Sequence, residues 1–101
     1  MTQGATATVV AGSYLATTTD PGVRLPHSWT SSGVGVQTDF TGAHLLHLAV
    51  AGCVLNDTYR EAAALGIEIL GVRVTASGWG LSRSSEGQCS REFNSRPIQA
   101  G

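Results

Sequence analysis

Residues 44–78 read HLLHLAVAGCVLNDTYREAAALGIEILGVRVTASG, and this stretch decides the fold of the chain. The segment from Ala43 to Leu65 has no proline and a single glycine, so it predicts one long helix. Thr41 or Asp39 can cap the first turn, and Gly66 is typical of the residue that follows a helix. Apolar residues occupy several sides of the front half, which predicts a helix buried at the centre of the protein.

A β-strand is predicted directly after the helix. Between residues 67 and 76, apolar side chains alternate with Glu68, Arg73 and Thr75. The alternation slips at Leu70-Gly71, where a glycine allows a β-bulge. The strand is expected to end at Ser77-Gly78.

The first 40 residues are rich in Thr, Ser, Gly and Val and predict short strands. Residues 5–11 and 12–18 carry β-branched residues in loose alternation, and residues 34–38 form a third candidate strand. Residues 23–33 are expected to be an irregular connection, because Pro26 excludes a central strand.

The end of the chain has a different character. Residues 79–101 show almost no apolar periodicity and predict an irregular tail. The expected fold class is therefore α+β, with a folded part over residues 1–78 and the tail over residues 79–101.

Composition limits the possible functions. The chain has 101 residues, 42% hydrophobic and 13% charged, which is typical of one folded domain. Its net charge is −1 without a basic cluster, so a nucleic-acid role is not expected. No apolar run reaches the roughly 18 residues of a membrane span, and the N-terminus lacks the features of a secretory signal. With only two cysteines, a secreted disulfide scaffold is not expected, and the cytoplasm is the predicted location.

Residues 42–78 resemble the OsmC/Ohr family of thiol-dependent hydroperoxide reductases. The resemblance rests on two leucines, a cysteine after small residues, a glycine after the helix, and a glycine-containing strand. The matching residues are Leu45-Leu46, Ala51-Gly52-Cys53, Tyr59, Ala62-Ala63, Gly66-Ile67 and Gly71-Val72-Arg73-Val74. The resemblance covers about a third of the chain and indicates the N-terminal part of the family domain. It implies a fold with long helices against curved sheets and an intertwined homodimer.

The resemblance also implies a chemistry, in which Cys53 is the peroxidatic thiol. A thiolate attacks an organic hydroperoxide, and the resulting sulfenic acid is reduced by a second thiol. The family's activating arginine comes from the N-terminal half, where Arg24 is the one arginine of this chain. An organic hydroperoxide and a thiol reductant are the expected partners, and no cofactor is implied.

Two positions depart from the family pattern. Ala43 occupies the position of a glutamate that orients the arginine, and Cys89 lies outside any second long helix that would carry a resolving cysteine. The alternative hypothesis is therefore a non-catalytic or truncated relative that serves as a dimerisation or small-ligand-binding module. A small domain with an uncovered helix face also favours a homodimer on its own account.

Other interpretations of these residues stay open at this point. Cys53 can be a small buried hydrophobic residue, as free cysteines often are. His44 and His47 lie at i,i+3 and could share a metal, but a third ligand is missing, so no metal site is expected. Trp29 and Trp79 are expected to be packing anchors.

Overall fold

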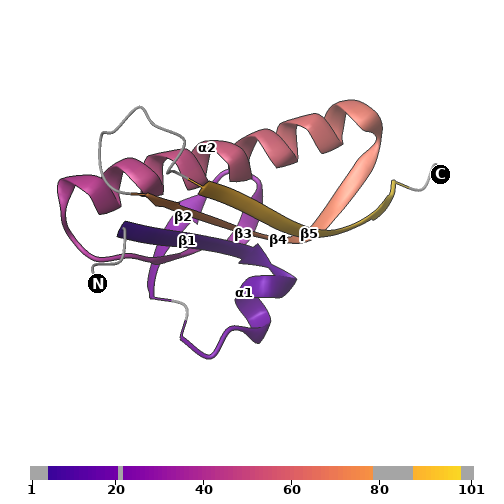
Figure 1. Ribbon diagram of the computed structural model, residues 1–101. Coiled ribbons are helices and arrows are strands. Elements are labelled where there is room, and N and C mark those ends of the chain that lie inside the picture. Colours follow the sequence, from indigo (N-terminus) through magenta and orange to yellow (C-terminus); the bar gives the residue numbers. More distant parts are fainter. Residues whose placement is uncertain (1–4, 21, 79–87, 99–101) are drawn as a thin grey trace.

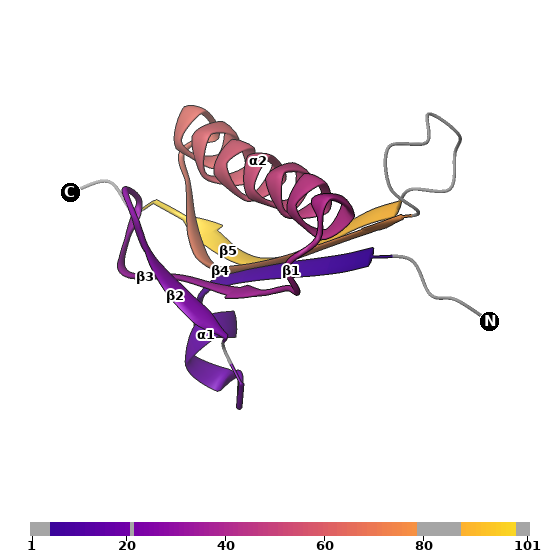
Figure 2. The same ribbon diagram turned by 90° about the vertical axis from the view of Figure 1, so that its left-hand side faces the viewer.

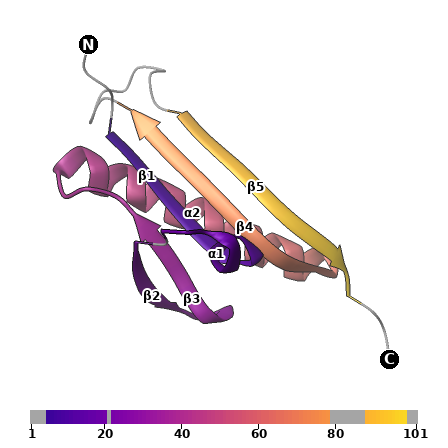
Figure 3. The same cartoon turned by 90° about the horizontal axis from the view of Figure 1, so that it is seen from below.

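A five-stranded antiparallel sheet with one helix on each face makes up the structure (Figures 1 and 2). The computed structural model describes residues 5–20, 22–78 and 88–98. Its elements, in chain order, are β1 (Ala5–Gly12), α1 (Ser13–Thr17), β2 (Val23–His27), β3 (Thr30–Gln37), α2 (Gly42–Leu65), β4 (Ile67–Gly78) and β5 (Gln88–Pro97). The strands lie in the order β2-β3-β1-β4-β5 (Figure 3). The predicted α+β class is confirmed.

Helix α2 forms where the sequence predicts it, and both of its ends are capped. Thr41 is the N-cap, and its hydroxyl accepts a hydrogen bond from the backbone N–H of His44 at 3.1 Å. Gly66 ends the helix in the left-handed region with φ 71°. Its backbone N–H donates to the carbonyls of Ala62 and Ala63, which would otherwise lack a partner.

The predicted deep burial of α2 is wrong for one of its faces. The helix packs on a single face of the sheet, so it buries only the stripe that faces β1 and β4 (Figure 2). The buried residues of α2 are His47, Ala51, Leu55, Thr58, Tyr59 and Ala62. The opposite side of its front half is apolar and exposed, and we call it the outer strip: Leu45, Leu46, Ala49, Val50 and Cys53. One sheet covers only about half of a helix, whatever residues the other half carries.

The core lies between α2 and the central strands. Alternate residues of β1, β3 and β4 point toward the helix, as expected for strands with one buried face. The core residues are Val9, Ala11, Val34, Val36, Ala51, Leu55, Tyr59, Val72, Val74 and Ala76. No helix within the described ranges is both long and apolar enough to cross a membrane.

Strand β4 confirms the predicted alternation and its interruption. Its register with β5 shifts between Ile69 and Gly71, which is where the sequence predicts a bulge. Gly71 also makes room for α1. A Cβ on Gly71 would lie 2.7 Å from the backbone nitrogen of Ser13, so a side chain here would push α1 off the sheet.

Of the two strands predicted for residues 5–18, the structure has the first and not the second. Residues 5–11 belong to β1, but residues 12–18, predicted as a strand, contain the short helix α1. The chain turns at Gly12, which has φ 63°, and Leu15 then packs under the sheet. The Thr17 hydroxyl donates to the Ser13 carbonyl at 3.0 Å. Hydrogen bonds of this kind allow β-branched threonines to adopt a helical turn. The alternation of residue types in the sequence does not show that they form.

The predicted irregular connection over residues 23–33 is also wrong. It forms β2 and the start of β3, which pair as a hairpin at one edge of the sheet (Figure 3). Pro26 is tolerated because β2 is an edge strand, and the register shifts between Leu25 and His27 around it.

The predicted irregular tail is wrong for residues 88–97. They form β5, which pairs with β4 along its length and is the other edge of the sheet. Its side chains from Cys89 onward are exposed, so an edge strand of this kind carries no apolar alternation that could predict it. The remainder of that tail, residues 79–87 and 99–101 with Trp79, lies outside the described residues.

Candidate functional site

Cys53 lies on the outer strip of α2 and is exposed as a free thiol. Within the described ranges, its sulfur makes no hydrogen bond to a side chain or to the backbone of another element. The alternative of a small buried hydrophobic residue is therefore wrong.

The structure does not bring Arg24 to Cys53 within one chain. Arg24 lies on β2 between Leu25 and Val23, and Leu25 borders a cavity against α2. Because side chains alternate along a strand, Arg24 points to the other face of the hairpin. The arginine and the thiol therefore do not form an activated pair in a single copy of the chain.

The two histidines of α2 have structural roles. His44 Nδ1 lies 2.7 Å from the Thr41 hydroxyl at the helix cap, and His47 is buried with its Nδ1 donating to the Ala43 carbonyl at 2.7 Å. Within the described part of the chain, no three side chains of the kinds that bind metals come together. Of the two positions that depart from the family pattern, Ala43 is in the first turn of α2 and Cys89 is an exposed free thiol on β5.

A cluster of aromatic rings forms where the β2–β3 hairpin meets α2. Trp29, at the turn of the hairpin, lies nearly parallel to Tyr59 of α2, with an interplanar angle of 13° and ring centroids 6.3 Å apart. His27 packs its ring edge-on against Tyr59 at 5.4 Å. These contacts join two elements that are about thirty residues apart in the chain.

Hydrogen bonds hold His27 in this position. Its Nδ1 lies 3.0 Å from the Thr30 hydroxyl, and its Nε2 lies 3.0 Å from the Asn56 side-chain oxygen on α2. Both ring nitrogens are therefore engaged, and the ring orientation is fixed from two sides. The aromatic wall is preorganised, which lowers the entropy lost when a ligand binds to it.

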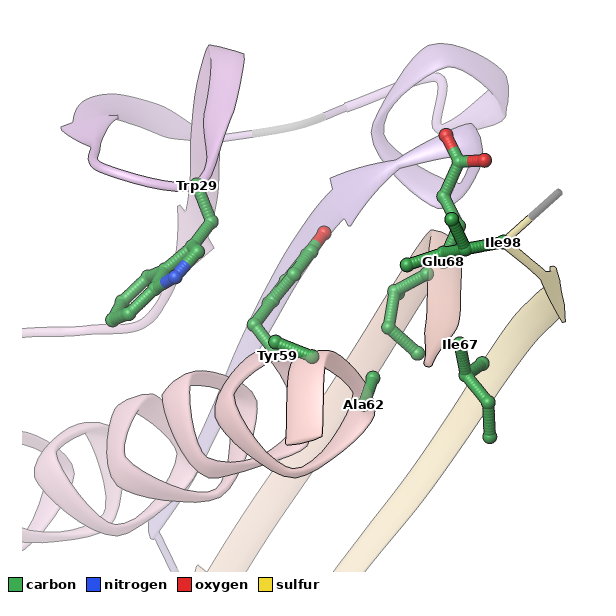
Figure 4. Close-up of a pocket in the computed structure, with 8 residues that line it drawn as sticks. Trp29, Tyr59, Ala62, Ile67, Glu68 and Ile98 are labelled. Atoms are coloured by element: carbon green, nitrogen blue, oxygen red, sulfur yellow. The ribbon is translucent and has the colours of Figure 1, made fainter. Parts of the chain in front are cut away.

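The Trp29–Tyr59 pocket opens beside this wall and has a volume of about 420 Å³ (Figure 4). Such a volume falls in the range of small-molecule sites. Its lining is mainly apolar and comes from the hairpin, the end of α2, the start of β4 and the residue after β5: Trp29, Tyr59, Ala62, Ala63, Ile67, Glu68, Ile69 and Ile98. Trp29 is 46% exposed and Ile98 is 56% exposed, so the pocket is accessible from solvent.

The Tyr59 hydroxyl is an unusual feature of this pocket. Tyr59 is 8% exposed, and its hydroxyl oxygen is buried without a hydrogen-bond partner among the residues that the structure describes. Buried tyrosine hydroxyls usually have a partner, because an unsatisfied polar group is destabilising. Burial also raises the pKa of the Tyr59 hydroxyl, so the group keeps its proton at neutral pH.

The charges around the pocket are paired. Glu68 is one of the residues that line the pocket (Figure 4). Its carboxylate accepts a hydrogen bond from Arg96 Nε at 2.8 Å across β4 and β5. This exposed ion pair leaves the pocket with apolar walls and no uncompensated charge from these two groups.

The sequence alone does not reveal this site. It predicts Trp29 as a packing anchor, and Tyr59 is one of the residues that carry the resemblance to the OsmC/Ohr family. A tryptophan in a turn between two strands is the one local signal, since an exposed large aromatic residue often marks a binding surface. Its pairing with Tyr59 depends on how the hairpin folds over α2.

No family model matches the sequence, and no curated protein and no solved structure is significantly similar to it. The resemblance of residues 42–78 to the OsmC/Ohr family therefore stays a prediction.

Proposed function

We propose that this chain is a small-ligand-binding module whose site is the Trp29–Tyr59 pocket. The proposal rests on one observation, a preorganised aromatic wall that carries a buried hydroxyl without a partner in the described part of the chain. An apolar ligand with a matching polar group would cover the wall and satisfy the hydroxyl. The sequence analysis gives this function as its alternative hypothesis, a non-catalytic module that binds a small ligand.

Binding can be followed through the fluorescence of Trp29. The chain has two tryptophans, so a Trp79→Phe variant leaves Trp29 as the single reporter. Naphthalene is a suitable flat apolar probe, and we expect a saturable change in Trp29 emission. Ala63 lines the pocket at an exposed helix position, so the larger side chain of Ala63→Leu occupies part of the pocket. We expect this variant to bind naphthalene at least about tenfold more weakly, because a single methylene group changes affinity in a packed apolar site by about 10- to 100-fold.

Ala64→Leu is the matched control, because Ala64 is the next exposed residue of the same helix and is not among the pocket-lining residues. It makes the same change of side chain and should leave naphthalene binding unchanged. Absence of saturable binding, or an equal effect of the two substitutions, contradicts the proposed function.

The exposure of Cys53 favours a second candidate, a thiol peroxidase of the OsmC type. The Cys53 thiolate would attack the distal oxygen of an organic hydroperoxide, forming an S–O bond while the O–O bond breaks and an alcohol leaves. A first reductant thiol would then condense with the sulfenic acid to a mixed disulfide and release water, and a second would free the Cys53 thiol and leave with the first as a disulfide. Exposed free thiols persist in reducing compartments, so this candidate is proposed for the cytoplasm.

A peroxidase site at Cys53 would need a second copy of the chain, because Arg24 of the same chain points elsewhere. The outer strip around Cys53 supports a homodimer, because apolar side chains gathered on one exposed helix face of a small domain typically mark an interface.

The peroxidase candidate is tested by mixing the protein with cumene hydroperoxide. Active protein consumes about one equivalent before reductant is added, since one thiol gives one sulfenic acid. Cys53→Ser should abolish this consumption, Arg24→Gln should slow it, and Cys89→Ser is the matched control at the other exposed cysteine. Equal consumption by wild type and Cys53→Ser excludes the candidate.

A further inference from the structure

We propose that the Trp29–Tyr59 pocket selects a flat, uncharged ring compound with a hydrogen-bond acceptor at its edge, and that the Tyr59 hydroxyl is the donor. This inference rests on the proposed function and adds the chemical class of the ligand.

The requirement for a flat ring follows from the pocket wall. Trp29 and Tyr59 lie within 13° of parallel, and both border the same cavity. Aromatic rings prefer offset stacking on faces of this kind. Figure 4 shows the Tyr59 ring standing off α2 between Trp29 and the Ile98 side, so a ring in the pocket can lie along these faces.

The requirement for an acceptor follows from the Tyr59 hydroxyl. Its oxygen is buried and has no partner within residues 5–20, 22–78 and 88–98, although His27 and Asn56 nearby are bonded to each other. A phenolic hydroxyl can donate one hydrogen bond as well as accept one, so an acceptor on the ligand would give its proton a partner. Because burial raises the pKa of Tyr59, this proton stays in place at neutral pH.

The preference for an uncharged compound follows from the surroundings. The remaining lining is aliphatic apart from Glu68, whose carboxylate is paired with Arg96. An anion would face this carboxylate, and a cation would have to compete with Arg96 for it. Either ion would also lose its hydration against apolar walls, which is unfavourable.

The test is a cycle of two probes and two proteins, all in the Trp79→Phe background. Naphthalene has no acceptor, whereas quinoline has the same shape with one ring nitrogen as acceptor. We expect Tyr59→Phe to weaken quinoline binding about tenfold, because it removes the donor. Naphthalene should bind equally well or better, since the variant no longer buries a polar group. The cycle cancels the different water solubility of the two probes.

Tyr14→Phe is the matched control, because Tyr14 is on α1 at the opposite face of the sheet. It should leave the binding of both probes unchanged. A second measurement needs no variant in the pocket: quinoline, but not naphthalene, should shift the absorbance titration of Tyr59 to higher pH. N-methylquinolinium, which is charged and has no acceptor, should bind more weakly than quinoline.

The outcomes separate the two proposals. If naphthalene binds and is blocked by Ala63→Leu, but Tyr59→Phe changes both probes by the same factor, the inference about the acceptor is wrong while the binding module stands. Binding of N-methylquinolinium as tight as that of quinoline overturns the preference for uncharged compounds. Absence of binding by every probe contradicts the proposed function itself.

Discussion

At the scale of single residues, Tyr59 links stability and binding through one hydroxyl group. Its ring belongs to the core, while its oxygen is buried and finds no partner among the described residues. The group thus stabilises the fold through apolar contact and destabilises it through its polar end. Sites built for ligands often keep such an imbalance, which the ligand relieves.

The pH dependence of unfolding should report this hydroxyl. Burial raises the pKa of Tyr59 in the folded state above the value of about 10 in the unfolded chain. The free energy of unfolding is therefore unaffected by this group below about pH 10. It falls as the pH rises from there through the folded-state pKa, because the unfolded chain gives up the Tyr59 proton more readily. Urea unfolding of Tyr59→Phe should show a smaller loss of stability in this range than the wild type.

Tyr14→Phe is the control for this measurement, because it removes a tyrosine outside the core. It should keep the wild-type loss of stability at high pH. At neutral pH, Tyr59→Phe should be neutral or more stable by up to about 1 kcal/mol, since it removes an unsatisfied buried group. A Tyr59→Phe variant that loses stability with pH as steeply as wild type would show that the hydroxyl is not buried.

At the scale of elements, the unit of α2 and β4 was predictable because its signals are local. The Thr41 cap, the Gly66 end and the bulge before Gly71 each depend on a few neighbouring residues. Elements at the edges of the sheet were not predictable in this way. Strand β5 is polar and exposed, and the threonines of α1 fold as a helix because Gly12 turns the chain first.

The contact between α1 and β4 gives a prediction about two glycines. A Cβ added at Gly71 meets the Ser13 backbone, whereas a Cβ added at Gly52 in α2 has nothing within 4 Å. We expect Gly71→Ala to lower the free energy of unfolding by about 1–3 kcal/mol through overpacking. Gly52→Ala should raise it by about 0.5–1 kcal/mol, because alanine is the better helix former.

Thermal or urea unfolding of the two variants measures this difference. Because the substitution is the same, effects of alanine on the unfolded chain largely cancel between them. Equal stability of the two proteins would mean that α1 does not pack on Gly71 as the structure has it.

At the scale of the whole molecule, the candidate site could not be predicted because it joins distant segments. Trp29 lies at a hairpin turn that was expected to be irregular, and Tyr59 lies on a helix that was correctly predicted. Their contact depends on the strand order, which places β2 and β3 beside one end of α2. No periodicity in the sequence connects two such positions.

The outer strip is the feature of the whole molecule that a second copy would explain. Leu45, Leu46 and Val50 are 39%, 36% and 41% exposed on one side of α2, next to Ala49 and Cys53. Apolar side chains gathered in this way on a small domain typically mark an interface. We expect light scattering to give the mass of a dimer, and Val50→Asp to give a monomer, because it places a charge in the middle of the strip.

Ala64→Asp is the matched control, since it adds the same charge at an exposed position of α2 about three turns beyond Cys53, outside the strip, and should leave the dimer intact. The thiol of Cys53 provides a second measurement in a Cys89→Ser background. Because Cys53 lies within the strip, a thiol reagent should modify it faster in the Val50→Asp protein than in the dimer. If the wild-type protein is monomeric at every concentration and the thiol reagent modifies Cys53 equally fast in both proteins, the outer strip is not an interface. The second copy of the chain that a peroxidase site at Cys53 requires is then missing as well.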